Sequence, residues 1–210
     1  MTALAQFTEL ELDALREVAN IGCGHAATVL SQMIGAPIAI DVPQLSWVPS
    51  AHVMEGVAES GERVVGLTMQ IVGDLMGETR FVVRESHARI LVDLLMGQPL
   101  GTGGLDDAME QSCLMEAGNV MASGFLNALA VFLNRCLLPS PPSLVISSPR
   151  ELAPGDVNEE VLVATTTFRF EDQAHAAHQA QGAFLFTLGA AARGSLFEAL
   201  RHFGVSSTAA

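Results

Sequence analysis

The sequence predicts an α+β fold made by internal duplication, in which two long helices pack on one face of a shared, mostly antiparallel sheet. Of the 210 residues, 50% are hydrophobic, which is enough for a sizeable core. Two long helical patterns begin near Thr8 and Asp106, and each is followed by β-favouring runs and a shorter helix. This repeated order predicts one pseudo-twofold domain over residues 1–210, with repeats of about 8–97 and 105–204.

The first repeat opens with a helix expected to start at Thr8 and to end before Gly35. Thr8 and Glu11 have the three-residue spacing of a capping box. Gly35 and Pro37 end the helical pattern. The apolar face of this helix is expected to contain Leu10, Leu15, Val18, Ile21 and Val29.

Short strands and one helix complete the first repeat. β-favouring runs bounded by turn residues predict strands over residues 38–42, 47–53, 63–72 and 79–83. Helical periodicity returns over residues 85–96 and stops at Gly97. The glycine-rich loop 97–104 is the expected boundary between the repeats.

The second repeat follows the same order. Its long helix is expected over about residues 106–135, because a group of prolines at 139, 141 and 142 ends the pattern. Strands are predicted over 143–147, 161–170 and 182–186, and a closing helix over about 190–203. Residues 171–181 are expected to form an exposed hairpin loop, and the tail after Gly204 to be disordered.

Charge and composition exclude several kinds of partner. A net charge of −13, with ten arginines and no lysine, argues against nucleic acids and anionic membrane surfaces. No apolar run approaches the roughly 20 residues that span a bilayer, and no signal-peptide pattern is present. We therefore expect a cytoplasmic protein without a nucleic-acid or membrane partner, for which a monomer is sufficient. Cys23, Cys113 and Cys136 are expected to be reduced, mostly structural thiols.

Each long helix carries the same polar stripe on one face. The first stripe is Asp13, Glu17 and Asn20, and the second stripe is Ser112, Glu116 and Asn119. At about 100° per residue, the members of a stripe fall within about 60° of one another. A proline follows each stripe at the same interval, Pro43 in the first repeat and Pro142 in the second. An isolated Glu-x-x-Asn is most simply a solvated helix face, but its duplication favours a functional site.

The residue types limit the chemistry of the stripes. A carboxylate can pair with an ammonium or guanidinium group. A carboxamide can hold a water molecule in a fixed orientation but cannot take its proton, so its strongest catalytic use is positioning. The stripes contain no P-loop and no metal-ligand cluster. We therefore expect no cofactor or metal bound by this chain, and any metal or phosphoryl group would come from the partner.

The doubled pattern D/S-x3-E-x2-N-x22-P resembles the CheC family of chemotaxis phosphatases, which includes CheX and the phosphatase part of FliY. The runs around Glu17 to Gly24 and Glu116 to Met121 are similar to the family's two site helices. Two motifs in one chain resemble CheC more than the single-motif CheX.

The resemblance implies hydrolysis of the aspartyl phosphate of a CheY-like response regulator, whose bound Mg²⁺ belongs to the regulator. It implies that the stripe asparagines orient water and that the stripe glutamates pair with the regulator's lysine. It also implies supporting roles for four further residues, with Asp13 and Ser112 at the interface and Pro43 and Pro142 shaping the chain that follows. CheD, which many family members bind, is a further candidate partner.

Alternatives remain open at the level of sequence. The chain could be a non-catalytic adaptor that binds CheD, a phosphorylated receiver or a flagellar-switch component, or only one of its two sites could work. Cys113 as a nucleophile is an alternative to a structural thiol. A surface metal site made by Asp172, His175 and His178 is an alternative to a polar loop.

Overall fold

The computed structural model of the chain describes residues 9–55, 57–59, 61–153, 160–171, 177–188 and 190–207. Its elements in chain order are α1 (Glu9–Ile34), β1 (Ile38–Ile40), β2 (Gln44–Pro49), the short 3-10 helix η2 (Ser50–His52), β3 (Val64–Gly73), β4 (Gly77–Arg84), α2 (Glu85–Met96), α3 (Ala108–Leu133), β5 (Leu137–Pro139), β6 (Ser143–Ser147), α4 (Pro149–Leu152), β7 (Glu160–Glu171), β8 (Ala177–Leu188) and α5 (Ala190–Ser207). The two long helices, α1 and α3, have the same length of 26 residues.

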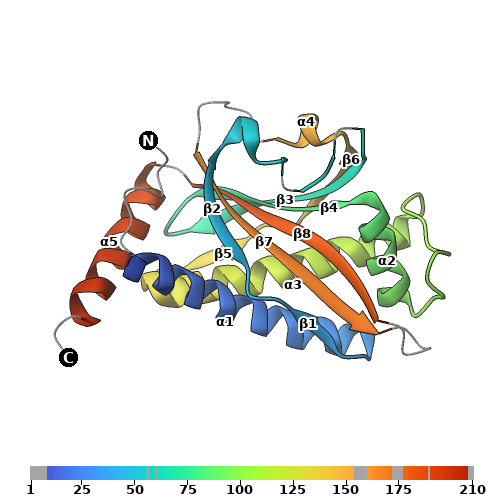
Figure 1. The fold of residues 1–210 in the computed structure, drawn as a ribbon, viewed down its shortest axis with the longest axis horizontal. Helices are drawn as coiled ribbons and strands as arrows, with labels where there is room; N and C mark the ends of the chain where they lie inside the picture. Colours follow the sequence, from blue (N-terminus) through green and yellow to red (C-terminus); the bar gives the residue numbers. More distant parts are fainter. Residues whose placement is uncertain are drawn as a thin grey trace.

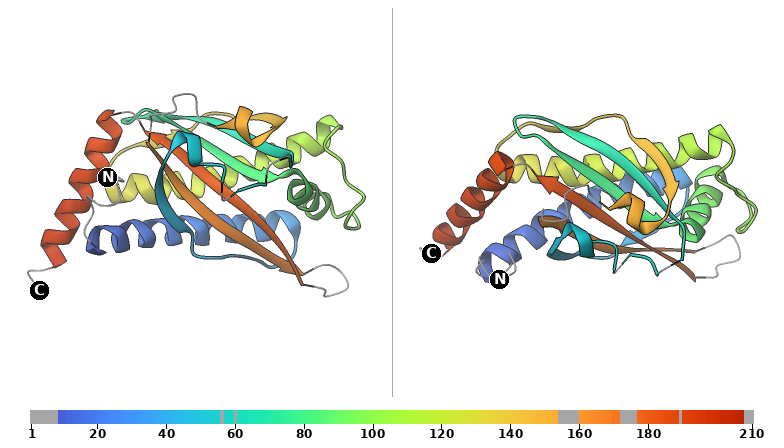
Figure 2. Two further views of the ribbon diagram at one scale, coloured as in Figure 1. Left: turned by 45° about the horizontal axis from the view of Figure 1, so that its top comes forward. Right: turned by 90° about the horizontal axis from the view of Figure 1, so that it is seen from above.

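A single curved sheet lies against the two long helices. Figure 1 shows α1 and α3 side by side and antiparallel on one face of the sheet, with α2 and α5 at opposite ends of the helix pair, and the turned views of Figure 2 agree. This arrangement confirms the predicted α+β class, with the long helices on one face. Of the described helices, α3 alone is long and apolar enough to cross a membrane, but half of its apolar window is buried within the fold.

The order of the strands carries the internal symmetry. The sheet runs β1-β7-β8-β4-β3-β5, with β2 also paired to β7 and β6 also paired to β3. Every pairing among the described strands is antiparallel. β4 and β8 meet in the middle. The short broken edge strand of each repeat pairs with the long hairpin of the other repeat, β1 and β2 with β7, and β5 and β6 with β3. The predicted pseudo-twofold relation therefore passes between β4 and β8.

A close contact between two glycine-containing turns joins the long helices. A Cβ atom on Gly22 would lie 2.7 Å from Cα of Phe125, and one on Gly124 would lie 2.9 Å from the carbonyl oxygen of Gly22. Glycine is therefore required at both positions for the backbones to approach this closely. Phe125 then stacks on Phe186 of β8, with ring centroids 4.4 Å apart, which fixes the helix pair on the sheet.

Two separate apolar cores lie on the two faces of the sheet. The larger core fills the space between the sheet and the long helices and includes Leu67, Met69 and Phe81. A smaller core on the opposite face includes Val82, Leu152 and Leu185 and is covered by the segments around η2 and α4. The central strands are thus buried on both faces, and the sequence analysis predicted only the helix-covered face.

A buried carboxylate organises the loop that joins the two repeats. Asp93 of α2 has no exposed surface. Its two carboxylate oxygens accept the backbone N–H groups of Gly101 at 2.7 Å and Gly103 at 2.5 Å. Because a buried charge needs such partners, this loop has one defined path from α2 to α3.

Several predicted boundaries differ from the structure. Ile21 and Val29 of α1 are 45% and 39% exposed, so their assignment to the apolar face was wrong. Residues 177–181 belong to β8, whereas the sequence predicted an exposed loop there. The last helix, α5, continues to Ser207, beyond its expected end near residue 203. β2 begins at Gln44 and gives way to η2 at Ser50, earlier than the predicted strand.

Candidate functional site

The first stripe lies on the solvent side of α1. Asp13, Glu17 and Asn20 are all exposed, while Leu15 and Ala19 on the same two turns are buried against the core. The buried face holds the helix in place, and the stripe faces away from the sheet. The structure therefore brings the three predicted residues together on one exposed surface.

The second stripe occupies the corresponding surface of α3. Ser112 and Glu116 are exposed and Asn119 is half-buried, whereas Leu114 and Ala117 between them are buried. The start of α3, one turn before Ser112, is fixed by a capping box. In it the Asp107 carboxylate accepts the backbone N–H of Met109 at 2.9 Å, and the Glu110 carboxylate accepts the backbone N–H of Asp107 at 3.3 Å.

The glutamates and asparagines of both stripes are free to bind an external group. Within the part of the chain that the structure describes, no side-chain hydrogen bond or ion pair involves Glu17, Asn20, Glu116 or Asn119. Their carboxylates can accept hydrogen bonds, and their carboxamides can both donate and accept. Each stripe therefore presents an unpaired acceptor and an unpaired amide one turn apart.

The supporting residue of the first stripe does have a partner. Nη1 of Arg16 donates to Oδ1 of Asp13 at 2.7 Å, and both side chains are mostly exposed. The corresponding residue of the second stripe, Ser112, makes no such pair among the described residues. The two stripes therefore share their Glu and Asn but differ at their first position.

The two predicted prolines lie in the sheet edges and not on the helix stripes. Pro43 is buried at the break between β1 and β2, and Pro142 is half-buried at the break between β5 and β6. Proline is tolerated there because an edge strand has backbone groups that need no ladder partner. Beside the first break, Asp41 donates its N–H to the Thr167 carbonyl at 3.0 Å, and its own carbonyl accepts the Thr166 hydroxyl at 2.7 Å.

The second break is anchored in a related way. The N–H of Ser140 donates to the carbonyl oxygen of Gln70 at 2.8 Å, and the Ser140 hydroxyl accepts the Gln70 N–H at 2.9 Å. The structure thus places each proline in an equivalent bend of its repeat, away from the stripe that precedes it.

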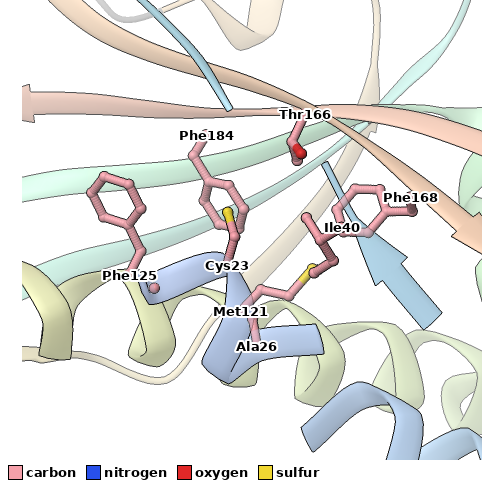
Figure 3. Close-up of a pocket in the computed structure, with 9 residues that line it drawn as sticks. Cys23, Ala26, Ile40, Met121, Phe125, Thr166, Phe168 and Phe184 are labelled. Carbon is pink, nitrogen blue, oxygen red and sulfur yellow. The ribbon is translucent and has the colours of Figure 1, made fainter. Parts of the chain in front are cut away.

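Cys23 gives no sign of a reactive site. Cys23 is buried in a small apolar cavity between α1, α3 and the sheet (Figure 3), and burial raises the pKa of its thiol to about 11. Thr166 also lines this cavity, and its hydroxyl donates to the Asp41 carbonyl. The cavity is therefore a packing gap, and all three cysteines are free thiols, as predicted.

No metal-ligand cluster is seen in the described ranges. Within them, no three His, Cys, Asp or Glu side chains are grouped as a metal site. Asp172 and His175 lie outside the described residues, as does the side chain of His178. The alternative of a surface metal site in that loop therefore stays a prediction from sequence.

Both stripe segments match one known protein family. Residues 10–46 and 109–146 match the model of the CheC-like family, and each match contains a whole stripe and its trailing proline. The chain is 29% identical over 179 residues to the CheY-P phosphatase CheC of Bacillus subtilis, a match that covers 80% of this chain and 83% of that protein.

A second relative and a solved structure are also similar to this chain. The chain is 27% identical over 139 residues to the flagellar motor switch phosphatase FliY of Bacillus subtilis, covering 64% of this chain but 35% of that longer protein. The crystal structure of Thermotoga maritima FliY superposes with a TM-score of 0.71 at 24% identity, over 94% of this chain and 98% of that one. This structural likeness shows that the two chains share a fold.

Proposed function

We propose that this chain is a protein phosphatase of chemotaxis signalling. Its two matches to the CheC-like family and its homology to CheC and FliY of Bacillus subtilis support this proposal. Its substrate is the aspartyl phosphate of a CheY-like response regulator. The observation that carries the proposal is that both family-matching segments present an exposed glutamate and an asparagine with no side-chain partner among the described residues. The name of the CheC relative, a CheY-P phosphatase, supplies the substrate class, and FliY is also described as a phosphatase.

In the proposed reaction, Asn20 and Asn119 each orient a water molecule in one of two equivalent sites. The carboxamide oxygen accepts one hydrogen of the water, and the amide group donates toward the phosphoryl oxygens. The water oxygen bonds to phosphorus as the bond from phosphorus to the aspartyl oxygen breaks. The carboxylate of the regulator is regenerated, and both protons of the water leave with phosphate as H₂PO₄⁻. Because asparagine takes no proton, its contribution is positioning.

The glutamates hold the regulator in place. Glu17 and Glu116 lie one turn before their asparagines, so an ion pair with the regulator's active-site lysine sets the distance at which each asparagine enters the site. Asp13 and Ser112 support this interface, and Pro43 and Pro142 shape the edge of the sheet behind it. The Mg²⁺ that neutralises the phosphoryl group is carried by the regulator as part of the substrate.

In this proposal the protein acts in the cytoplasm. It acts as a monomer, because a single chain already carries both stripes. CheD is a further proposed partner.

The decisive experiment follows the loss of label from a ³²P-phosphorylated CheY-like regulator at fixed Mg²⁺. We expect faster decay with the wild-type chain and spontaneous decay with the double variant Asn20→Ala/Asn119→Ala. Asn127→Ala is the matched control, because Asn127 is an exposed asparagine of α3 outside the second stripe. Binding of the regulator without faster decay by the wild-type chain would reject the phosphatase and support the adaptor.

A further inference from the structure

A cation lies beside the first stripe, and no cation occupies the corresponding position beside the second stripe. Arg16 lies three residues after Asp13 and four residues before Asn20, and its side chain is 55% exposed. The corresponding residue of α3 is Met115, which lies three residues after Ser112 and four before Asn119. The first repeat thus combines the carboxylate of Asp13 with the guanidinium of Arg16. The second repeat combines the hydroxyl of Ser112 with the thioether of Met115.

The guanidinium of Arg16 has two polar neighbours on its own helix face. Residues three and four apart on a helix lie next to each other, so Arg16 is placed to reach either Asp13 or Asn20. In the structure it donates to Asp13 at 2.7 Å, and Asn20 has no side-chain hydrogen bond among the described residues. Arginine has only donors, so its second option would occupy the carboxamide oxygen of Asn20.

That oxygen is the acceptor on which the proposed reaction depends. If a guanidinium holds it, one of the two lone pairs of the oxygen is used and the carboxamide is turned toward Arg16, out of position for the attacking water. Met115 has no N–H group in its side chain, so Asn119 faces no such competitor and Ser112 needs no charge. The need to keep the asparagine oxygen free therefore accounts for the pairing of Asp13 with Arg16 in the first repeat and of Ser112 with Met115 in the second.

We propose that Asp13 is a positioning residue that holds Arg16 away from Asn20 and so keeps the carboxamide of the first stripe free. The inference rests on the proposed function, and it assigns a specific task to the first residue of the stripe. The other two residues three or four positions from the arginine are Leu12 and Ala19, whose side chains carry no acceptor. When Asp13 is removed, Asn20 is therefore the remaining side-chain acceptor at this spacing.

The kinetic test isolates the first stripe in an Asn119→Ala background. We expect Asp13→Ser to lower the stimulated dephosphorylation rate about twofold to fivefold, the range of an exposed charged contact. Removing the competitor as well, in Asp13→Ser/Arg16→Met, should return the rate to the level of the Asn119→Ala parent, as should the conservative Asp13→Glu. A loss that Arg16→Met does not rescue would assign Asp13 a merely structural role and overturn the proposal.

The matched control removes only the guanidinium, as Arg16→Met in the same Asn119→Ala background. This variant should keep the rate of its parent, because Asp13 already holds Arg16 away from Asn20. A loss as large as that of Asp13→Ser would show that the Asp13–Arg16 pair itself supports the site, which also overturns the proposal.

A second measurement tests the same contact without any activity. In the protein with ¹⁵N-labelled asparagine, the side-chain amide signals of Asn20 are assigned from their absence in Asn20→Ala. We expect them to shift in Asp13→Ser and to return in Asp13→Ser/Arg16→Met. Unchanged signals in Asp13→Ser would mean that Arg16 turns to solvent, and would overturn the inference. If the Asn119→Ala parent gives no stimulated decay, the proposed function fails for this stripe, while the amide signals still decide the inference.

Discussion

The two stripes share their reacting pair but differ in what surrounds it. Glu and Asn have the same spacing in α1 and α3, and all four side chains lack partners among the described residues. Around Asn20 the surface is charged, with the Asp13–Arg16 pair, and the asparagine is exposed. Asn119 is half-buried, and the residue beside it that corresponds to Arg16 is the uncharged, half-buried Met115. The common pair carries the proposed chemistry, and the surroundings set how a partner approaches each site.

The largest expected effect comes from removing one asparagine at a time. Each single variant, Asn20→Ala or Asn119→Ala, should keep only the part of the stimulated rate that the other stripe supplies, and adding the second substitution should lower that remainder by about 100-fold, because a misplaced reactant costs about that much. The decay of phosphorylated regulator measures how the rate of the wild-type chain divides between the stripes. If one single variant behaves like the wild-type chain, the corresponding stripe is silent and the two are not equivalent.

A glycine at the helix contact should matter to both stripes at once. Gly22→Ala places a Cβ 2.7 Å from backbone atoms of α3, so we expect a loss of about 1–3 kcal/mol in the free energy of unfolding. Gly24→Ala is the control, because a Cβ there meets nothing within 4 Å and alanine in a helix stabilises by up to about 1 kcal/mol. Urea denaturation of both variants measures the difference. Equal stabilities would mean that α1 and α3 can separate without loss.

The loop between the repeats offers a stability effect of similar size. Asp93→Asn replaces one of two acceptor oxygens by an NH₂ group that faces a backbone N–H of Gly101 or Gly103. We expect the free energy of unfolding to fall by about 1–3 kcal/mol, because one buried donor loses its acceptor. Thermal unfolding followed by circular dichroism measures the change. Asp106→Asn is the control, because Asp106 is an exposed residue of the same α2–α3 connection with no side-chain hydrogen bond among the described residues, and it should have a much smaller effect.

The smallest expected effect is a pH dependence at a contact between the repeats. Nδ1 of His87 in α2 accepts the backbone N–H of Gln181 in β8 at 3.1 Å, and burial lowers the pKa of this histidine from 6.5. The unfolded chain therefore binds the proton more tightly, so stability is lost as the pH falls from about 6.5 toward the lower folded pKa. We expect the unfolding midpoint to drop between pH 7 and pH 5 by more in the wild-type chain than in His87→Asn. Parallel curves would mean that this histidine is protonated equally in both states.

Much of the fold follows from local patterns in the sequence. The helix predicted at 85–96 and the strand predicted at 143–147 match α2 and β6 at both ends. Turn residues and periodicity are local properties, so they place elements before any packing is known. The stripes were found in the same way, because a spacing of three and four residues defines one face of any helix.

Contacts between distant segments decided what the sequence analysis missed. The segment 177–181 is rich in Ala, His and Gln, and it is a strand because β7 pairs with it over its length. β5 was not predicted because it contains Pro139, which a strand at the edge of a sheet tolerates. Strand pairing is a tertiary property, so composition alone could not assign either segment.

The sequence by itself determined the α+β class, the duplication and the two stripes with their Glu and Asn, since these depend on residue spacing along single helices and strands. The tertiary structure alone decided which side of each helix is buried. Leu15, Val18 and Ala19 of α1 pack into the core, while Ile21 and Val29 stay exposed. The tertiary structure also decided that Arg16 donates to Asp13. Helix spacing alone allows Arg16 to reach either Asp13 or Asn20, and only the atomic positions show which acceptor it uses.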